Sequence, residues 1–367
     1  MNVVAATAAY DRWLAQRLRV IVKSDLTRKH REMSEDPFSF LRATFYRWAQ
    51  VWPQLCADLT AAPKVLGVGD LHVENFGTWR DGEGRLIWGI NDFDEATTLP
   101  YTNDLVRLCT SALIAISEAR LETPLRRACN SVLEGYTEAL RTGGEPVVLA
   151  EKNRWLRDLA MGRLKEQRLY WDRLLELRRP AVPPTAGELA FLKEAMPEKH
   201  LPIRICHRQA GLGSLGRQRF TALAHWRGGT IAREAKALTT SAWWWCSDRS
   251  QPLQYSQIMS RAVRVADPFL NVRAGWVVRR LAPDCSRIEM KHLAGVQDEC
   301  RLLWMMGWET GNVHLGNPRQ REAIRRDLLE RNMRQRNMRQ RKGEWLLKAA
   351  RAMRNATIED WREWRDR

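Results

Sequence analysis

The first sixty residues show a spacing of apolar positions that predicts α-helices. Residues 1–62 are rich in Ala at first, and over 38–59 apolar side chains recur at helical spacing. Asp36 and Pro37 stand directly before this second run. Proline suits the first turn of a helix, so this pair predicts a helix start at that point.

The pattern changes at Val65, where short apolar runs predict strands. One run covers 65–68 and another covers 85–90. Between them, residues 81–84 read Asp-Gly-Glu-Gly, which is typical of a turn. We therefore expect two short extended segments joined by loops.

Helical spacing dominates the next hundred residues and returns at the end of the chain. It runs from 103 to about 192, with predicted breaks at Gly143-Gly144 and in the proline-rich stretch 180–184. From 293 to 367 the pattern is helical again.

Between these helical regions lies a second block that predicts strands. Arg227-Gly228-Gly229 predicts a hairpin turn within it. The four expected strands are 203–206, 219–225, 230–237 and 276–281.

Composition indicates a folded, soluble chain. Of the 367 residues, 44% are hydrophobic, which excludes general disorder. No apolar run approaches the roughly 18–20 residues that cross a bilayer, and no secretory signal is visible, so we expect a cytoplasmic protein without a membrane span. The seven cysteines are scattered without CxxC spacing, which favours free thiols in a reducing compartment.

The charge balance favours anionic partners. Lys and Arg number 60 and Asp and Glu 43, a formal net charge of +17. Near the C-terminus a basic five-residue unit occurs twice, at 332–336 and 337–341. It allows two interpretations, an arm that binds nucleic acid or a solvated helix, and we favour the solvated helix.

The densest cluster of polar residues predicts phosphotransfer chemistry. Asp70 has an amide side chain, Asn75, five positions later, and Asp92 and Asp94 follow a short predicted strand. In phosphotransfer enzymes a first Asp orients the attacking hydroxyl, and an Asn and a later Asp hold Mg²⁺. His72, inside the cluster, has two interpretations, metal ligand or residue that orders the loop, and we favour the second.

A glycine-rich segment predicts a second part of the same site. Gly211, Gly213, Ser214 and Gly216 lie between two predicted strands, as in the loop that covers the phosphates in protein kinases, and not between a strand and a helix. The following strand, 230–237, carries two cations that can contact phosphate. We favour Lys236 for this role, with Arg233 as the alternative. In a regular strand they face opposite sides.

The chain resembles an uncharacterised bacterial family known as domain of unknown function 2252. The resemblance covers about 35–315, and its most specific strings are 69–77 and 91–95. Its supporting strings are Pro37-Phe38-Ser39-Phe40-Leu41-Arg42, Asp104-Leu105-Val106-Arg107-Leu108, the glycine-rich segment, Lys236 with Ser241, and Val278-Arg279-Arg280-Leu281.

The same two strings also look like those of aminoglycoside phosphotransferases and choline kinases. This likeness implies that Asp70 is the catalytic Asp, that Asn75, Asp92 and Asp94 belong to the metal site, and that Asp104 has a structural role. In those enzymes the glycine loop and its Lys precede the catalytic loop, whereas here they follow it, so the likeness implies a circularly permuted chain. The Glu that normally pairs with the Lys is missing, and three substitutes remain open: Gln254, Gln257 and Glu234.

Together these observations predict an α+β, two-lobed kinase-like fold, circularly permuted, in which a small antiparallel sheet lobe follows a mainly helical lobe. The expected units are 1–64, an N-terminal helical segment; 65–200, the helical lobe with the catalytic and metal loop; 201–292, the nucleotide-binding lobe; and 293–367, C-terminal helices with a basic tail.

The predicted function is an ATP- and Mg²⁺-dependent phosphotransferase that acts on a hydroxyl of a small molecule or protein. Two alternatives are a non-catalytic nucleotide-binding regulator and a nucleic-acid-binding protein, which the charge of +17 motivates.

Overall fold

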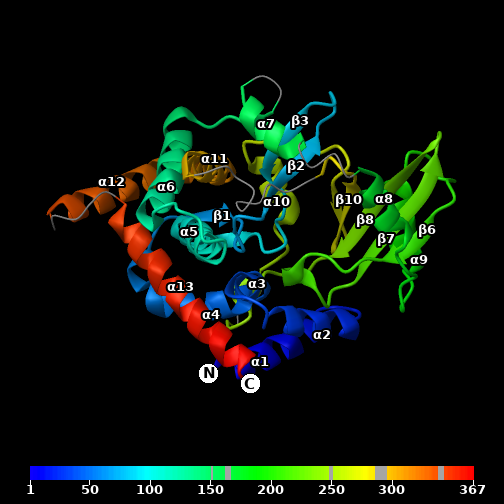
Figure 1. Cartoon of the computed structure of the whole chain (residues 1–367), viewed down its shortest axis with the longest axis horizontal. Helices are drawn as coiled ribbons and strands as arrows, with labels where there is room; N and C mark the ends of the chain where they lie inside the picture. Colours follow the sequence, from blue (N-terminus) through cyan, green and yellow to red (C-terminus); the bar gives the residue numbers. More distant parts are fainter. Residues whose placement is uncertain (150–151, 162–166, 248–250, 286–295, 338–342) are drawn as a thin grey trace.

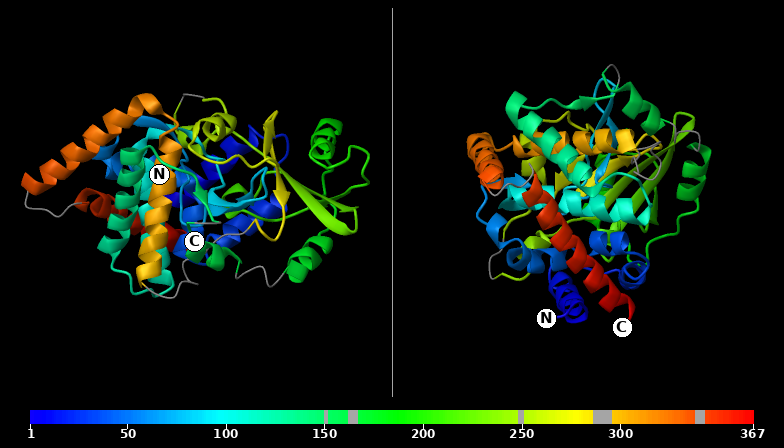
Figure 2. Two further views of the ribbon diagram at one scale, coloured as in Figure 1. Left: turned by 90° about the horizontal axis from the view of Figure 1, so that it is seen from above. Right: turned by 60° about the vertical axis from the view of Figure 1, so that its left-hand side comes forward.

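The computed structural model describes residues 1–149, 152–161, 167–247, 251–285, 296–337 and 343–367. The fold is mixed α+β, as predicted, and its three small sheets are antiparallel throughout. Figures 1 and 2 show a five-stranded sheet at one end of the molecule and helices around the two smaller sheets.

Four helices build the N-terminal region: α1 (Val3–Ala15), α2 (Lys23–Glu32), α3 (Pro37–Ala43) and α4 (Phe45–Leu55). The predicted start at Asp36-Pro37 is confirmed, since the Asp36 carboxylate accepts the Ser39 N–H at 2.7 Å. The helical pattern predicted over 38–59 is confirmed, but it forms two helices. Thr44 leaves the helical conformation, with φ −123° and ψ 40°, and divides the run into α3 and α4.

Two small sheets follow, and together they hold more strands than the sequence predicts. The first pairs β1 (Lys64–Gly67) with β4 (Thr97–Pro100), and the second joins β2 (Phe76–Arg80), β3 (Leu86–Ile90) and β5 (Val147–Val148). Strands β1 and β3 confirm the predictions at 65–68 and 85–90. The sequence did not predict β2, β4 and β5. Strand β2 contains a glycine, β4 ends in a proline and β5 has only two residues, so the strands with which they pair decide their conformation.

Helix α5 (Tyr101–Glu118) runs through the middle of the largest hydrophobic core, and it is buried along almost its whole length. It is followed by α6 (Leu125–Thr142), which ends at Gly143 with φ +97°, as the predicted break requires. Three further helices are α7 (Arg154–Met161), α8 (Gln167–Leu175) and α9 (Ala186–Glu194). The loop between α8 and α9 contains the proline-rich break.

The five-stranded sheet has the order β6-β7-β8-β10-β9 and confirms the four predicted strands within a residue or two. Its strands are β6 (Arg204–His207), β7 (Arg219–Trp226), β8 (Gly229–Ala237), β9 (Asn271–Arg273) and β10 (Trp276–Leu281), with α10 (Tyr255–Arg261) between β8 and β9. Arg227 and Gly228 form the predicted hairpin turn, both with positive φ. Two separate hydrophobic clusters contain most of the buried apolar side chains of this sheet, together with residues of the helices that pack on it.

Three helices close the chain: α11 (Val296–His314), α12 (Arg321–Asn337) and α13 (Glu344–Arg365). Helix α11 crosses α6 so closely that Gly307 leaves no room for a side chain against the Val132 carbonyl. Helix α13 packs on α5, and Thr110 donates to the Ala350 carbonyl at 3.3 Å. The duplicated basic unit lies partly at the end of α12, and its second copy falls mostly outside the described residues.

Two expectations from composition can be compared with the structure. None of the described helices combines the length and apolar composition that a transmembrane span needs. All seven cysteines are free thiols, and five of them are buried.

Candidate functional site

A buried carboxylate holds the loop that presents Asp70. Gly69 begins this loop with φ +80°, and its N–H and that of Val68 donate to the Asp104 carboxylate at 2.9 and 2.6 Å. The His314 imidazole lies 3.0 Å from the same carboxylate. Asp104 therefore has a structural role, as expected from the sequence likeness to aminoglycoside phosphotransferases and choline kinases, and together with His314 it fixes the backbone from which Asp70 extends.

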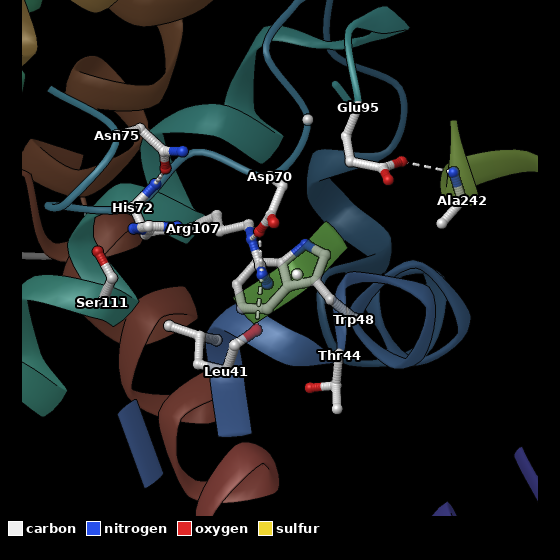
Figure 3. A network of polar contacts seen from close by, with 12 residues as sticks. Leu41, Thr44, Trp48, Asp70, His72, Asn75, Glu95, Arg107, Ser111 and Ala242 are labelled. Atoms are coloured by element: carbon white, nitrogen blue, oxygen red, sulfur yellow. Dashed lines mark hydrogen bonds and ion pairs between the residues drawn. The ribbon is translucent and has the colours of Figure 1, made fainter. Parts of the chain in front are cut away.

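Asp70 forms an ion pair with Arg107 of α5, whose side chain is fully buried. In Figure 3 the Arg107 guanidinium lies between the Asp70 carboxylate and the Leu41 carbonyl. Its Nε is 2.8 Å from Asp70 Oδ1, its Nη2 also contacts Oδ1, and its Nη2 is 2.9 Å from the Leu41 oxygen. Burial raises the pKa of Asp70, and Arg107 opposes this rise.

Sequence reasoning gave Arg107 no role in the site. Its guanidinium is fully buried, and it lies 4.8 Å from the ring centroid of Trp48 and 5.0 Å from that of Phe45. An arginine at the centre of the apolar string Leu105-Val106-Arg107-Leu108 was the available signal, because a buried charge needs a partner.

Asn75 closes the loop below Asp70. Its side-chain oxygen accepts the His72 N–H at 2.7 Å, and its backbone carbonyl accepts the Asn91 N–H at 3.0 Å. The His72 ring accepts the Glu74 N–H at 3.2 Å and meets Phe38 edge-on. These contacts support the preferred interpretation of His72 as a residue that orders the loop.

The structure brings Lys236 to the two acids that follow β3. Its Nζ is 2.6 Å from Asp94 Oδ2 and 3.4 Å from Asp92 Oδ1. Burial and then Asp92 raise the pKa of Asp94, and Lys236 opposes them. Arg233 lies away from these acids, with Nε 2.9 Å from the Ala195 carbonyl, so of the two cations on β8 only Lys236 reaches the site.

None of the three proposed substitutes for the missing Glu pairs with Lys236. Glu234 is surrounded by arginines instead, which lie on β7, β10 and the loop after β6: Arg219, Arg279 and Arg208. These cations hold the pKa of Glu234 well below its usual range in spite of its burial.

The glycine-rich segment folds over Asp70. A Cβ on Gly213 would lie 2.9 Å from the Arg42 carbonyl oxygen and 3.6 Å from Asp70 Oδ2, so glycine is required there. Gly211 begins the turn with φ +73°, and Gly216, with φ +97°, packs on Leu26 of α2.

The hydrogen bonds of this segment are largely internal. Residues Leu212–Ser214 form one 3₁₀ turn. The N–H groups of Ser214, Leu215 and Arg217 donate to carbonyls within the turn. The segment is therefore a compact cap on the site in this conformation.

Glu95 joins three parts of the chain around the cap. It accepts from Arg217 Nη2 at 2.8 Å and from the Ala242 N–H at 2.6 Å, as Figure 3 shows for Ala242. Burial raises the pKa of Glu95, and Arg217 and the Ala242 N–H oppose the rise. The hydroxyl of Ser241 donates to the Glu95 carbonyl at 3.0 Å, so the loop after β8 is attached to the acid loop.

These residues line one cavity, which we call the Asp70 cleft. It contains the predicted residues Asp70, Asn75, Asp92, Asp94, Gly211, Gly213 and Ser214, together with Glu95 and Arg217. The sequence did not predict its other wall, which comes from the N-terminal helices and contributes Tyr10, Lys29, Arg42 and Tyr46. Of these only Arg42 stands in a supporting string of the family resemblance, and the packing of α1–α4 places all four in the wall.

A second cavity adjoins the first, and we call it the arginine cavity. Asp92 and Gly211 line both cavities. Trp79 and Tyr170 supply aromatic surface, and its cations are Arg173, Arg208, Arg264, Arg279 and Arg280.

The tryptophan run 243–245 serves as packing between elements. Trp243 stacks on Phe45, and the indole N–H groups of Trp244 and Trp245 donate to Thr97 and to the Tyr46 carbonyl. The run therefore attaches the loop after β8 to α4.

Asp92, Asp94 and Asn75 supply the oxygen ligands that Mg²⁺ prefers. The Oδ1 atom of Asp94 is buried without a hydrogen-bond partner, so one carboxylate oxygen remains for a cation. Among the residues that the structure describes, no three His, Cys, Asp or Glu side chains are grouped as a metal site. The donor set thus fits Mg²⁺, which usually takes few protein ligands and keeps several waters.

Comparisons with known proteins find one similarity, which covers part of the site. No match to the chain is found among curated proteins or among solved structures. Residues 19–169, which include Asp70, Asn75, Asp92 and Arg107, match the model of the family described as "Uncharacterized protein conserved in bacteria (DUF2252)", and this match confirms the predicted family resemblance over that part of the chain.

Proposed function

We propose that this protein is a Mg²⁺- and ATP-dependent phosphotransferase whose acceptor is a hydroxyl group. The observation that carries the proposal is the position of Gly213, which covers Asp70 while Asp92, Asp94 and Asn75 line the same cleft. A phosphate-covering turn, a carboxylate and a set of magnesium ligands are the parts that phosphoryl transfer requires.

Asp70 would act as the proton acceptor. Arg107 engages its Oδ1 atom from two nitrogens, and Oδ2 is the oxygen nearer to Gly213. In the proposed reaction the acceptor oxygen forms a bond to the γ-phosphorus, and the bond from that phosphorus to the β–γ bridging oxygen breaks. ADP leaves with that bond's electron pair, and the hydroxyl proton passes to Asp70.

Asn75, Asp92 and Asp94 would hold Mg²⁺, which neutralises charge on the phosphates when it is bound. Lys236 forms ion pairs with Asp92 and Asp94 in the structure. Its ammonium is a mobile point charge on a long stem, so it can turn from these acids to a phosphate oxygen. We therefore assign Lys236 to binding of the nucleotide phosphates.

We place the nucleotide in the arginine cavity. This cavity shares Asp92 and Gly211 with the Asp70 cleft, so a nucleotide there would direct its phosphates toward Asp70. On this proposal the five-stranded sheet and the helical part act as the two lobes of a kinase-like fold with a permuted chain. Contact between the terminal helices α1 and α13 is compatible with permutation.

A second candidate function is a nucleotide-binding regulator without catalysis. The pairing of Lys236 with Asp92 and Asp94, and not with a glutamate, favours it. Both candidates bind nucleotide, and they differ only in whether Asp70 accepts a proton.

Calorimetric titration with ATP and Mg²⁺ tests the shared claim. We expect the wild-type protein to bind, and Asp92→Asn to weaken binding at least tenfold because a magnesium ligand is lost. Asp58→Asn is the matched control, since Asp58 is exposed in a 3₁₀ turn and does not line the cleft. Absence of binding by the wild type, or equal binding by both Asp variants, would reject the proposal.

ATP hydrolysis, measured as ADP release, separates the two candidates. A phosphotransferase commonly hydrolyses ATP slowly without its acceptor, and Asp70→Asn should reduce this rate while nucleotide affinity stays within about threefold. A rate that is zero in the wild type and with every hydroxyl compound supplied would favour the regulator.

A further inference from the structure

The Asp70 cleft is lined by cations as well as acids, and some of their donor atoms lack hydrogen-bond partners. Lys29 lies on α2 and is only 2% exposed. Its Nζ donates to the Gly213 carbonyl at 3.2 Å, and no ion pair is found for it among the described residues. Burial therefore lowers the pKa of Lys29 to about 8.

Arg42 and Arg217 also line the cleft. Arg42 pairs with Glu74 through Nη1 at 2.9 Å, but its buried Nε has no hydrogen-bond partner. Arg217 bonds to Glu95 through Nη2, whereas its Nη1 has no hydrogen-bond partner and forms only a long ion pair with Asp94, at 3.8 Å. Buried donors without partners are costly, and a ligand that accepts from them would remove that cost.

The carboxylates of the cleft are already assigned to other cations. Asp70 pairs with Arg107 and Glu95 with Arg217. Asp92 and Asp94 share Lys236. The ammonium of Lys29 thus has none of these carboxylates as its ion-pair partner. It lies next to the turn that covers Asp70, where the acceptor hydroxyl must enter.

We propose that the acceptor carries an anionic group, a phosphate or a carboxylate, and that Lys29, Arg42 and Arg217 bind this group in the Asp70 cleft. This inference rests on the proposed function, because it names the class of acceptor. Arginine forks and a lysine point charge are the donors that such oxyanions favour. The anionic group would hold the molecule by one end and leave a hydroxyl for Asp70.

Titration of the full-length protein with inorganic phosphate, followed by calorimetry at pH 8, tests the anion site. We expect binding that Lys29→Met weakens at least tenfold and that Arg42→Gln also weakens. Lys23→Met on the same helix is the control, since Lys23 is exposed, and should leave affinity unchanged. Because an anion beside Lys29 favours its protonated form, binding at pH 8 should take up protons, and the measured heat should change with the buffer.

Titration with acetate in place of phosphate distinguishes a carboxylate from a phosphate as the anionic group. The anion that binds more tightly identifies the group that the acceptor carries. Binding that is absent, or that is the same in wild type and both cleft variants, would overturn the inference. Circular dichroism and unfolding midpoints of each variant show whether it is folded.

Nucleotide competition separates this inference from the proposed function. Phosphate should still bind when Mg²⁺ and a non-hydrolysable ATP analogue saturate the protein, since the acceptor and the γ-phosphate occupy different places. If the analogue displaces phosphate, the cations serve the nucleotide, and only the acceptor inference fails. If phosphate binds through Lys29 but no nucleotide binds, the anion site stands and the phosphotransferase proposal fails.

Discussion

Arg107 holds the Asp70 carboxylate in position and opposes the rise in its pKa. Arg107 is fully buried while the Asp70 side chain is 18% exposed, and Nη2 of Arg107 donates to the Leu41 carbonyl as well as contacting Asp70. A largely buried ion pair of this kind contributes little net stability compared with apolar packing, but its disruption leaves an uncompensated charge. The role of this ion pair is to fix the Oδ1 atom of Asp70 and thereby to orient Oδ2.

We predict that Arg107→Met destabilises the protein by about 3–5 kcal/mol at neutral pH, because Asp70 loses its buried partner. The pKa of Asp70 should rise further in this variant, so acid should restore part of the lost stability. Urea unfolding at pH 5 and pH 7 measures both effects.

A double-mutant cycle provides the control for this pair. Adding Asp70→Asn to Arg107→Met should cost less than the sum of the two single changes. Arg141→Met, which breaks the exposed pair with Glu138, should cost no more than about 1 kcal/mol. Additive losses would show that Asp70 and Arg107 are not coupled.

At the scale of single elements, helix α11 carries an acid in the core. Glu309 is 4% exposed, its Oε1 accepts from Asn312 at 2.7 Å, and Gly89 on β3 leaves room for its carboxylate. Burial raises the pKa of Glu309 to about 8, and Asn312 and Arg264 only partly oppose this rise. The folded protein therefore keeps Glu309 protonated at neutral pH.

This carboxyl predicts a pH dependence with a definite sign. Glu309 binds a proton more tightly in the folded than in the unfolded state, so its stabilising effect is complete below about pH 4.5 and is lost as pH rises through about 8. Each pKa unit corresponds to about 1.4 kcal/mol, so the total change is several kcal/mol.

Glu309→Gln should remove this dependence, because the amide does not ionise. We expect the variant to match the wild type at pH 5 and to exceed its free energy of unfolding at pH 9. Glu322→Gln, at an exposed position of α12, is the control and should follow the wild type at both values. If the stability of Glu309→Gln also follows that of the wild type at both pH values, Glu309 is ionised in the folded protein.

At the scale of the whole molecule, the hydrophobic interior is divided unequally. One large core joins the N-terminal helices, the two small sheets, α5, α6, α11 and residues of α13. The five-stranded sheet has its own smaller clusters, for example around Phe220 and Val278. The helices before and after the sheet therefore depend on one another more than on the sheet between them.

We predict that Leu346→Ala in α13 costs about 2–5 kcal/mol, since Leu346 is fully buried in the large core. Amide hydrogen exchange should then accelerate in α5, while β7 and β8 keep most of their protection because their clusters are separate. Lys348→Ala, exposed on the same helix, should change neither. Equal acceleration in α5 and in the sheet would indicate a single cooperative unit.

The sequence predicted the elements whose local pattern is strong. The long helices, the strands β6, β7, β8 and β10, and the turn at Arg227 follow from periodicity and turn chemistry, which act between neighbouring residues. It failed where partners decide the conformation. Thr44 divides a continuous helical pattern, and β2, with Gly77 inside it, becomes a strand because β3 pairs with it.

The candidate site shows the same division. Asp70, Asn75, Asp92 and Asp94 are close in sequence, so their spacing alone indicated a shared purpose. Whether the glycine-rich segment faces them was beyond any local pattern, since more than a hundred residues intervene, and the structure brings Gly213 to Asp70. Arg42 and Arg107 stood only in supporting strings of the family resemblance, without an assigned role, and Lys29 and Arg217 stood in none.

The sequence by itself therefore determined the α+β class, most of the regular elements and the cluster of acids, because each depends on residues within a few positions. Only the tertiary structure decided which cations meet those acids and which helices line the same cleft. Burial and ion pairing act through space, and side chains from α2, α3, α5 and β8 become neighbours only once the core has packed.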